Sequence, residues 1–366
     1  MNKIYAENLE QGALDQFTDA LAHPAVLRGA LMPDAHAGYT LPFGAVVACR
    51  DMIFPSFVGY DIGCGMCALP TSFDVRQVRE NAKSIFDGIY RDVPVGFSHN
   101  QKDSVWEGES ALPRTPDMQR IFDKNGLRQL GSLGGGNHFI EIGADETNKV
   151  WVIIHSGSRG IGHAVASHYM RIAGGGDKVK EGCFGLDVNS DDGKAYVTDL
   201  NFCLAFALEN RKEMMRRIVR VMQSCIGHGA AYWDELINRN HNHAELREGE
   251  WIHRKGATHA ELREGMMGVI PDNMRDGSFI VRGKGNPDSL WSSSHGAGRV
   301  LGRKEAVRVL NIDDFTKTMV NVTAKVDLDT LDESPAAYKD IFEVMRLQSD
   351  LVEVVAHVAP IINIKG

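Results

Sequence analysis

The sequence lacks any apolar run approaching the roughly 18 residues that a membrane-spanning helix needs. Residues 1–11 hold no apolar stretch of the kind found in a signal peptide. Cysteine is sparse, with six scattered residues among 366, and such spacing does not build a dense disulfide framework. From these absences we expect a protein of a reducing compartment, by default the cytoplasm, with no membrane partner.

Positive charge is also in deficit. The sequence has 40 Lys and Arg residues and 48 Asp and Glu residues, which gives a formal net charge of −8. This balance argues against indiscriminate binding to nucleic acid. A local basic track or a metal-bridged phosphate site remains compatible with it. The hydrophobic content of 43% and the charged content of 24% are typical of a globular protein with a sizeable core.

No linker rich in proline or serine divides the chain, so we expect one domain of mixed helices and sheets over residues 1–366. Apolar periodicity predicts the elements within that domain. Helices are expected within residues 1–30, 75–89, 119–130, 202–222 and 232–237. Strands are expected at 44–49 and 150–155, and loops or turns at 32–38, 96–118, 156–160 and 174–193.

Two further features of the sequence carry no function in this interpretation. The longest predicted helix holds five basic residues, and a solvated helix face explains them better than an RNA contact does. They are Arg211, Lys212, Arg216, Arg217 and Arg220. The heptapeptide His-Ala-Glu-Leu-Arg-Glu-Gly occurs at 243–249 and again at 259–265. Seven residues are too few for a repeat array, so we interpret the copies as two similar local turns.

The segment 58–66 places a carboxylate, Asp61, three residues before a thiol, Cys64, among several glycines. Glycine permits close approach of the backbone, so this segment can turn both side chains toward one point. Carboxylate and thiolate are both metal donors. The competing interpretation is a buried, glycine-rich strand end with an inert packed thiol. Cys64 and Cys67 also form a C-x-x-C pair, which is weak without a second pair or a redox context.

Three histidines lie in settings that suit a metal ion. His138 follows a run of glycines and an asparagine, His155 ends an apolar strand, and His241 lies in a polar turn. Each histidine alone is better explained as a hydrogen-bonded structural residue. Together with Asp61 and Cys64 they form a plausible ligand set for two divalent ions that share the thiolate. Two adjacent metals suit phosphoryl transfer, since they stabilise the attacking and leaving oxygens together.

A fourth histidine, His295, differs because small residues surround it and Arg299 follows four positions later. Small neighbours leave room for a bulky substrate at the imidazole, which is a competent nucleophile toward phosphorus. Arg299 offers a bidentate contact to phosphate. The basic, glycine-containing loop 282–286 is a weaker phosphate-binding candidate.

Seven segments, in order along the chain, resemble motifs of the RtcB family of RNA-splicing ligases. They are 33–38, 61–65, 134–141, 155–160, 241–242, 254–257 and 294–299, and Tyr338 and the terminal 364–366 extend the likeness. The resemblance implies an α+β fold, with mixed β-sheets and surrounding helices around a central metal cleft. It also implies an enzyme that uses GTP and manganese to join an RNA 3′-phosphate or 2′,3′-cyclic phosphate to a 5′-hydroxyl, in RNA repair or tRNA splicing.

The same resemblance implies roles for individual residues. The two manganese ions would be held by Asp61, Cys64, His138, His155 and His241, and Cys64 would be shared. His295 would be the nucleophile that takes up GMP as a phosphoramidate, with Arg159 and Arg299 near the phosphates. Positions that hold the guanine nucleotide are matched by Asn137, Phe139, Glu141, Ser278, Ala297, Gly298, Tyr338 and Lys365.

The sequence departs from the family at Asp272-Asn273-Met274, where the family usually has Gly-Ser-Met in the nucleotide pocket. An ionised Asp272 beside a phosphate would repel it, so the departure bears on nucleotide affinity or identity. The stretch between His241 and Arg254 is also short, and the chain is compact for the family. These differences indicate a divergent member with a narrower RNA substrate, such as a repaired break.

Two alternatives to ligation stay open on the sequence. One is a metal-dependent phosphodiesterase that opens 2′,3′-cyclic phosphates, and the other is an RNA-end binding protein with a degenerate pocket. Zinc suits the same donors as manganese. RNA and GTP are the expected partners, with room for an accessory activator protein. Candidates for a local basic track are Arg159, Lys255, Arg282, Lys284, Arg299 and Arg303.

Overall fold

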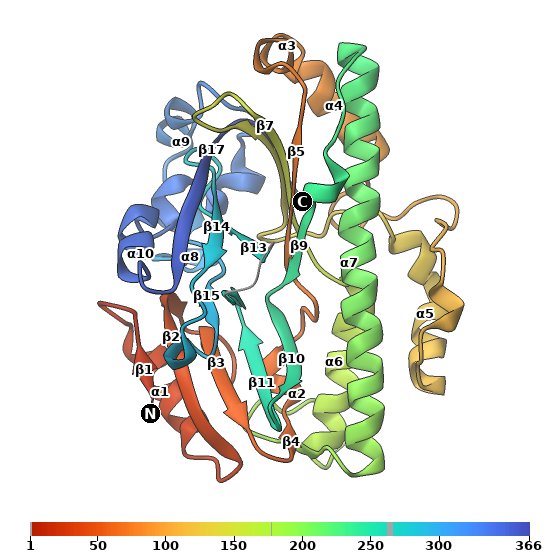
Figure 1. Ribbon diagram of the computed structural model, residues 1–366, viewed down its shortest axis with the longest axis vertical. Coiled ribbons are helices and arrows are strands. Elements are labelled where there is room, and N and C mark those ends of the chain that lie inside the picture. The colour runs from red at the N-terminus through yellow and green to blue at the C-terminus, as the bar shows by residue number, and fades with distance from the viewer. Residues whose placement is uncertain (1, 177, 262–265) are drawn as a thin grey trace.

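The computed structural model describes residues 2–176, 178–261 and 266–366, and two main β-sheets organise them (Figure 1). The strands of the larger sheet, in their order across it, are β13 (Met267–Pro271), β14 (Ser278–Gly283), β17 (Val352–Lys365), β6 (Phe139–Ala144), β7 (Val150–Ser156), β5 (Gly65–Thr71) and β9 (Ile237–Asn240), with β16 (Thr323–Ala324) beside β17. Those of the smaller sheet are β1 (Lys3–Ile4), β2 (Val26–His36), β3 (Phe43–Cys49), β11 (Glu250–Lys255) and β10 (Asn242–Arg247). Two ribbons pair β12 (Ala257–His259) with β15 (Ser292–Ser294) and β4 (Met52–Ile53) with β8 (Leu186–Asp187).

Helices pack around these sheets, and the longest, α7, runs along one side of the molecule (Figure 1). The helices are α1 (Gln11–Leu21), α2 (Pro55–Val58), α3 (Val75–Glu80), α4 (Ala82–Asp92), α5 (Pro116–Gln129), α6 (Arg159–Ala173), α7 (Asp191–Ile226), α8 (Arg303–Val309), α9 (Ile312–Thr318) and α10 (Ile341–Leu347). The predicted α+β class is confirmed. Within the described ranges, no helix combines the length and the apolar character that crossing a bilayer requires.

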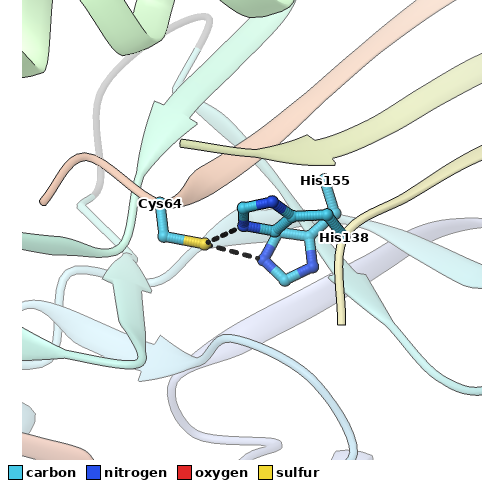
Figure 2. A group of neighbouring side chains, drawn as sticks. All are labelled: Cys64, His138 and His155. Carbon is cyan, nitrogen blue, oxygen red and sulfur yellow. Dashed lines mark hydrogen bonds between the residues drawn. The ribbon is translucent and has the colours of Figure 1, made fainter. Parts of the chain in front are cut away.

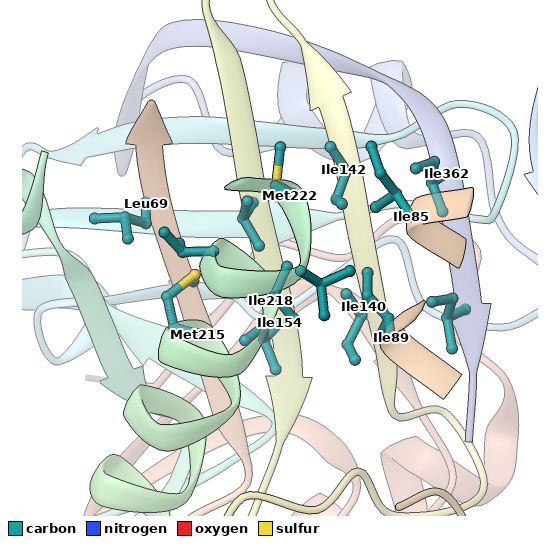
Figure 3. Close-up of a cluster of buried hydrophobic side chains, with 14 of the residues drawn as sticks. Leu69, Ile85, Ile89, Ile140, Ile142, Ile154, Met215, Ile218, Met222 and Ile362 are labelled. Carbon is teal, nitrogen blue, oxygen red and sulfur yellow. The ribbon is translucent and has the colours of Figure 1, made fainter. Parts of the chain in front are cut away.

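The main core lies between the larger sheet and the pair α4 and α7 (Figure 3). Ile85 and Ile89 on α4 recur at helical spacing, as do Met215, Ile218 and Met222 on α7, so each helix turns one apolar stripe inward. They pack against Leu69, Ile140, Ile142, Ile154 and Ile362, which lie on β5, β6, β7 and β17. This packing holds the strands that carry the functional residues on a rigid base.

The chain crosses from the larger sheet to the smaller one between β9 and β10, and a single residue separates these two strands. β9 pairs with β5 in the larger sheet, and β10 pairs with β11 in the smaller sheet. His241 is the one residue between β9 and β10. The chain therefore passes from one sheet to the other at a predicted metal ligand.

Several predicted elements agree with the structure. The strands expected at 44–49 and 150–155 are β3 and β7, and the helix at 119–130 is α5. The helix at 202–222 is the middle of α7, which begins and ends further out. The helix at 75–89 is divided into α3 and α4 at Asn81, whose φ of −102° and ψ of 10° are not helical.

Other predictions are wrong. The helix expected within residues 1–30 is confined to α1, because β1 precedes it and β2 begins at Val26. The loop expected at 32–38 is largely the end of β2, which pairs with β3 through a register shift between Leu31 and His36. The helix expected at 232–237 is a single 3₁₀ turn, Trp233–Glu235, followed directly by β9.

The first copy of the duplicated heptapeptide is not an isolated turn, contrary to the prediction. That copy forms β10 and the turn that leads to β11. His243 from this copy stacks on His259 from the second copy, with ring centroids 4.7 Å apart. Residues 262–265 of the second copy lie outside the described residues.

Candidate metal and nucleotide site

The thiol of Cys64 lies at the centre of the predicted metal ligands. Its Sγ is 3.3 Å from Nε2 of His138 and 3.1 Å from Nε2 of His155. Figure 2 shows the sulfur facing the ring nitrogens of both histidines; His138 immediately precedes β6, and His155 lies on β7. Nε2 of His138 is also 2.9 Å from Oδ2 of Asp61, and Nε2 of His155 is 3.2 Å from Nε2 of His241. The structure thus brings all five predicted ligands together.

A tight turn between α2 and β5 presents Asp61 and Cys64 on the same side. The amide of Cys64 donates to the carbonyl of Asp61 over 3.1 Å. Gly63 adopts a φ of +72°, and an added Cβ would collide with Ala207 on α7, so this turn requires glycine. The amide of His241 donates to the carbonyl of Cys64 over 2.7 Å, which places His241 beside the thiol.

Arg211 connects the segments that carry the predicted ligands. Its position contradicts the prediction of a solvated basic face. Its side chain is fully buried on α7. The guanidinium donates to the carbonyls of Gly63 and Ser156 over 2.9 Å and 2.8 Å. It also donates to the side-chain oxygens of Asn238 and Asn240 over 2.7 Å and 2.6 Å. One arginine therefore joins the Cys64 turn, the end of β7 and β9.

Burial sets the protonation states at the cluster. Burial lowers the pKa of His155 and His241 well below the usual range, with the neighbouring histidines adding to the effect, so both rings are neutral. Burial and the Asp61 carboxylate raise the pKa of the Cys64 thiol well above its usual range. Burial also opposes ionisation of Asp61, but the contact with His138 outweighs it and lowers that pKa to about 2.

The donor set fits a divalent cation. One thiol, one carboxylate and three imidazoles are ligands that transition-metal ions accept. Nδ1 of His155 donates to the carbonyl of Asn137 over 3.1 Å, which fixes the ring so that Nε2 faces the cluster. Such a second hydrogen bond is the usual way to orient a metal-binding histidine. Cys64, His138 and His155 offer ligand atoms that all lie within 4.8 Å of one another, close enough to hold one ion.

His295 lies at the edge of this cluster, with its ring centroid 4.9 Å from that of His241. Its Nδ1 donates to Oδ2 of Asp34 over 2.6 Å, and its backbone amide donates to the same oxygen over 3.1 Å. Burial opposes ionisation of Asp34, but His295 outweighs it and lowers the pKa of that carboxyl. Nε2 of His295 is therefore the ring nitrogen left for chemistry. Asp34 belongs to a motif of the sequence, but no role was predicted for it.

A cavity of about 250 Å³ opens at His295. Most of the predicted nucleotide-binding residues line it, together with Arg299: they are Asn137, Phe139, Ala297, Gly298, Tyr338 and Lys365. Glu141 and Ser278 lie buried outside this lining, on β6 and β14. The cavity also receives Asp272, the residue at which the sequence departs from the family.

Glu333 organises the charged wall of this cavity, although sequence reasoning did not single it out. Its buried carboxylate accepts from the Tyr338 hydroxyl over 2.6 Å and pairs with Lys365 and Arg303 over 2.5 Å and 2.6 Å. Arg299 approaches it within 3.4 Å. Burial opposes ionisation of Glu333, but Lys365 and Arg303 outweigh it and lower its pKa to about 2. A lone glutamate in a short 3₁₀ segment gives no sequence signal of this role.

A second cavity, of about 590 Å³, opens on the other face of the metal cluster, at Asp61 and His138. Arg159 lines this second cavity, whereas Arg299 lines the first, so the two predicted phosphate arginines lie in different cavities. Of the other basic-track candidates, Arg303 lines the first cavity with Arg299, and three have partners of their own. Lys255 is buried beside Ser56, Arg282 pairs with Glu353, and the Lys284 ammonium donates to the carbonyl of Ser349.

Comparison with known proteins gives a consistent result. The family described as tRNA-splicing ligase RtcB matches residues 16–112 and 99–366. An RNA-splicing ligase RtcB1 of Escherichia coli strain ATCC 25922 is 36% identical, over 98% of this chain and 95% of its own length. RNA-splicing ligase RtcB of Escherichia coli K12 is 35% identical, with the same coverage of both chains. A tRNA-splicing ligase RtcB of Nanoarchaeum equitans is 28% identical, over 100% of this chain and 94% of its own.

Proposed function

Since this chain belongs to the RtcB family of RNA-splicing ligases, we propose that it joins RNA ends through a GMP-histidine intermediate at His295. The substrates are an RNA that ends in a 3′-phosphate or 2′,3′-cyclic phosphate and an RNA that begins with a 5′-hydroxyl. The observation that carries the proposal is the position of His295. Its ring is oriented by Asp34, lines a cavity of about 250 Å³ and lies beside the cluster of predicted metal ligands.

Asp61, Cys64, His138, His155 and His241 would hold two manganese ions, with the Cys64 sulfur shared. When bound, these ions would neutralise phosphate charge and align the reacting oxygens. The neutral state of His155 and His241 supports this assignment, because an imidazole binds metal only without its second proton.

His295 supplies the nucleophile in the first step. Nδ1 keeps its proton through the bond to Asp34, so the lone pair on Nε2 attacks the α-phosphorus of GTP. An N–P bond forms, and the bond to pyrophosphate breaks. The RNA 3′-phosphate, which arises by hydrolysis where the end is cyclic, then takes GMP from His295. Finally the 5′-hydroxyl attacks the activated phosphate and releases GMP.

The cavity at His295 would hold the guanine nucleotide. Lys365 lies over the Phe139 ring at 5.0 Å, and both line the cavity with Tyr338. Arg299 and Arg303 bring positive charge to the same wall. That charge is partly balanced by Glu333, which holds the side chains in place so that little ordering is needed on binding.

The larger cavity at Asp61 and His138 is the proposed entry for an RNA end. It combines Arg159 and Lys124 with the fully exposed aromatic ring of Phe97. Cationic groups near an aromatic platform suit a single-stranded nucleic acid, since they contact its phosphates and its bases. Predicted metal ligands line both cavities, since Asp61 and His138 line this one and His155 lines the nucleotide cavity.

The test is a search for the protein–GMP adduct. Protein loaded with manganese and incubated with GTP labelled at the α-phosphate should yield an acid-labile adduct on the intact chain. The variants His295→Ala and Cys64→Ala should form none. A folded, metal-loaded sample without adduct would contradict the proposal. If that sample still opened 2′,3′-cyclic phosphates without GTP, the phosphodiesterase alternative would replace it.

A further inference from the structure

Asp272 is held in the nucleotide cavity by a turn that does not depend on its side chain. The turn joins β13 to β14, and Pro271 pairs with Ser278 across it. The amide of Asp272 donates to the carbonyl of Gly277 over 2.8 Å. Oδ1 of Asn273 accepts from the amides of Arg275 and Asp276 over 2.9 Å and 3.0 Å. The turn is therefore fixed by backbone atoms and by Asn273, which leaves the carboxyl of Asp272 available for another role.

One oxygen of this carboxyl is buried and unused. Oδ2 of Asp272 accepts from Nδ2 of Asn273 over 3.0 Å. Oδ1 is buried and finds no hydrogen-bond partner in the part of the chain that the structure describes. A buried polar atom without a partner is costly, so native proteins usually supply one. The residue lines the His295 cavity, where a ligand can do so.

Three further polar atoms lie beneath the same end of the cavity. They are Oε1 of Glu141, Oγ of Ser278 and Oδ1 of Asn363, which are buried and make no hydrogen bond of good geometry among the described residues, although Ser278 and Asn363 are close enough to Glu141 to act on its pKa. Glu141 on β6 lies opposite Asn363 on β17. The Asp272 carboxyl is close enough to Glu141 to influence its ionisation. The oxygens of Asp272, Glu141 and Asn363 accept hydrogen bonds when the carboxyls are ionised, so they suit a ligand that brings N–H donors.

We propose that Asp272 selects the nucleobase: its carboxyl accepts an N–H from a purine that carries an exocyclic amine, beside the acceptor of Glu141. This inference rests on the proposed function, because it assigns the base end of the nucleotide that His295 attacks. A guanine offers two kinds of donor on one edge, a ring N–H and an amino group, and two carboxyls match them. A purine without the amino group leaves the Asp272 oxygen unsatisfied, which disfavours its binding.

The protonation of both carboxyls agrees with this assignment. Burial and the nearby Asp276 raise the pKa of Asp272 to about 8. Burial raises the pKa of Glu141 to about 8 as well. Both groups are therefore largely neutral at pH 7, and Asp272 does not repel the nucleotide phosphates there. The N–H groups of the bound base favour the ionised form of these two carboxyls. Binding of the nucleotide should therefore release protons into the solvent.

The experiment compares binding of GMP and IMP, which differ only in the exocyclic amine, to the manganese-loaded protein by titration calorimetry. The wild type should bind GMP about tenfold more tightly than IMP, since one hydrogen bond to a carboxyl is worth about that factor. Asp272→Gly, which introduces the residue usual in the family, should reduce the preference to about twofold or less. Asp87→Asn, which changes an exposed carboxylate on α4, is the control and should keep the preference.

A second readout does not depend on the glycine variant folding well. The number of protons released on GMP binding is obtained by calorimetry at pH 7.5 in two buffers of different ionisation enthalpy. The wild type should release protons, and Asp272→Asn should release fewer. A GMP preference that is unchanged in Asp272→Gly, or proton release that is unchanged in Asp272→Asn, would overturn the inference. Selective GMP binding without a protein–GMP adduct would contradict only the proposed function. Adduct formation with an unchanged GMP preference would contradict only the role of Asp272.

Discussion

At the scale of single residues, one oxygen of Asp34 controls both the backbone and the ring of His295. Oδ2 accepts from Nδ1 of the ring, from the backbone amide of His295 and, over 3.3 Å, from the amide of Gly296. The carboxyl is fully buried, so water does not compete for these bonds. The ring of His295, the proposed nucleophile, is thus held in one tautomer and one orientation.

We predict that Asp34→Asn lowers the rate of adduct formation by about 10²-fold or more, because an amide cannot hold the Nδ1 proton as the carboxylate does. Metal content should stay at the wild-type level, since Asp34 is not among the metal-binding residues. The measurement is the rate of GMP transfer to the protein across pH 6 to 9, with metal content determined on the same samples. Asp87→Asn, on the exposed face of α4, should behave like the wild type; an equal loss in both variants would refute the role of Asp34.

The residues that the sequence predicted and those it missed differ in their surroundings. The sequence singled out Cys64 and the four other predicted ligands, which the structure brings together, because metal donors have few other reasons to occur in such glycine-rich or strand-end settings. Asp34 and Glu333 were missed because a carboxylate becomes a positioning group only through the partners that the fold brings to it. Those partners are remote in sequence: His295 lies 261 positions from Asp34.

At the scale of elements, local periodicity predicted the apolar faces of α4 and α7 well and the strand β2 poorly. α4 and α7 each bury one regular apolar stripe, and such a stripe is visible in the sequence. β2 contains Pro33, Asp34 and His36, which are typical of a loop. It is a strand because β3 pairs with it and β15 packs beside it, and the serine hydroxyl of Ser294 accepts from the amide of Asp34 over 3.4 Å. These non-local contacts override the local preference.

α7 differs from an ordinary amphipathic helix because it buries a charged residue as well as an apolar stripe. Met215, Ile218 and Met222 pack on the sheet, while Arg211, one turn earlier, reaches four acceptors. Periodicity identifies the apolar stripe but does not distinguish a buried arginine from a solvated one. The four acceptors come from separate segments that meet only in the folded protein.

We predict that Arg211→Met lowers the free energy of unfolding by about 3 to 5 kcal/mol, because it leaves four buried acceptors without a donor. The Cys64 turn and the end of β9 would also lose their common support, so metal affinity should fall. Urea denaturation and metal titration measure the two effects. Arg220→Ala is the matched control on the same helix, since that side chain is 68% exposed, and it should change stability by no more than about 0.5 kcal/mol. An Arg211→Met protein as stable as Arg220→Ala would contradict this account.

At the scale of the whole molecule, buried carboxyls give stability a dependence on alkaline pH. Burial raises the pKa of Glu141 to about 8 in the folded protein, whereas an unfolded glutamate titrates near 4.3. The folded state therefore binds more protons than the unfolded state between those values. Stability contributed by the neutral Glu141 is complete below about pH 4.3 and is lost progressively as pH rises to about 8.

We predict that stability of the nucleotide-free protein declines between pH 7 and 8, and that Glu141→Gln reduces the slope by about 1 kcal/mol per pH unit. Histidines do not mask the effect, because unfolded histidine is mostly neutral above pH 7. The measurement is urea denaturation at several pH values in this range, at constant metal content. Glu343→Gln, which changes an exposed glutamate on α10, should keep the wild-type slope. A Glu141→Gln protein with an unchanged slope would show that Glu141 is already ionised.

The metal-binding cluster lies where the two sheets meet. Cys64, His138 and His155 belong to the larger sheet or its edges, and His241 leads directly into the smaller sheet. Asp34, which orients His295, lies on β2 of the smaller sheet. An ion held by these donors would therefore link both halves of the fold. This arrangement supports the prediction of one catalytic domain rather than two.

Metal binding should for this reason stabilise the molecule as a unit. After treatment with a chelator, manganese at about 100 times its dissociation constant should raise the free energy of unfolding by about 2.7 kcal/mol for each ion bound, seen as one cooperative transition at higher temperature. Cys64→Ser should lose this shift because a hydroxyl is a poor substitute for a bridging thiolate. Cys67→Ser should keep it, although its base stability should fall, because Cys67 belongs to the main apolar core. If manganese stabilised Cys64→Ser as much as the wild type, the ion would bind elsewhere. The proposed link between the two sheets through the metal ion would then be wrong.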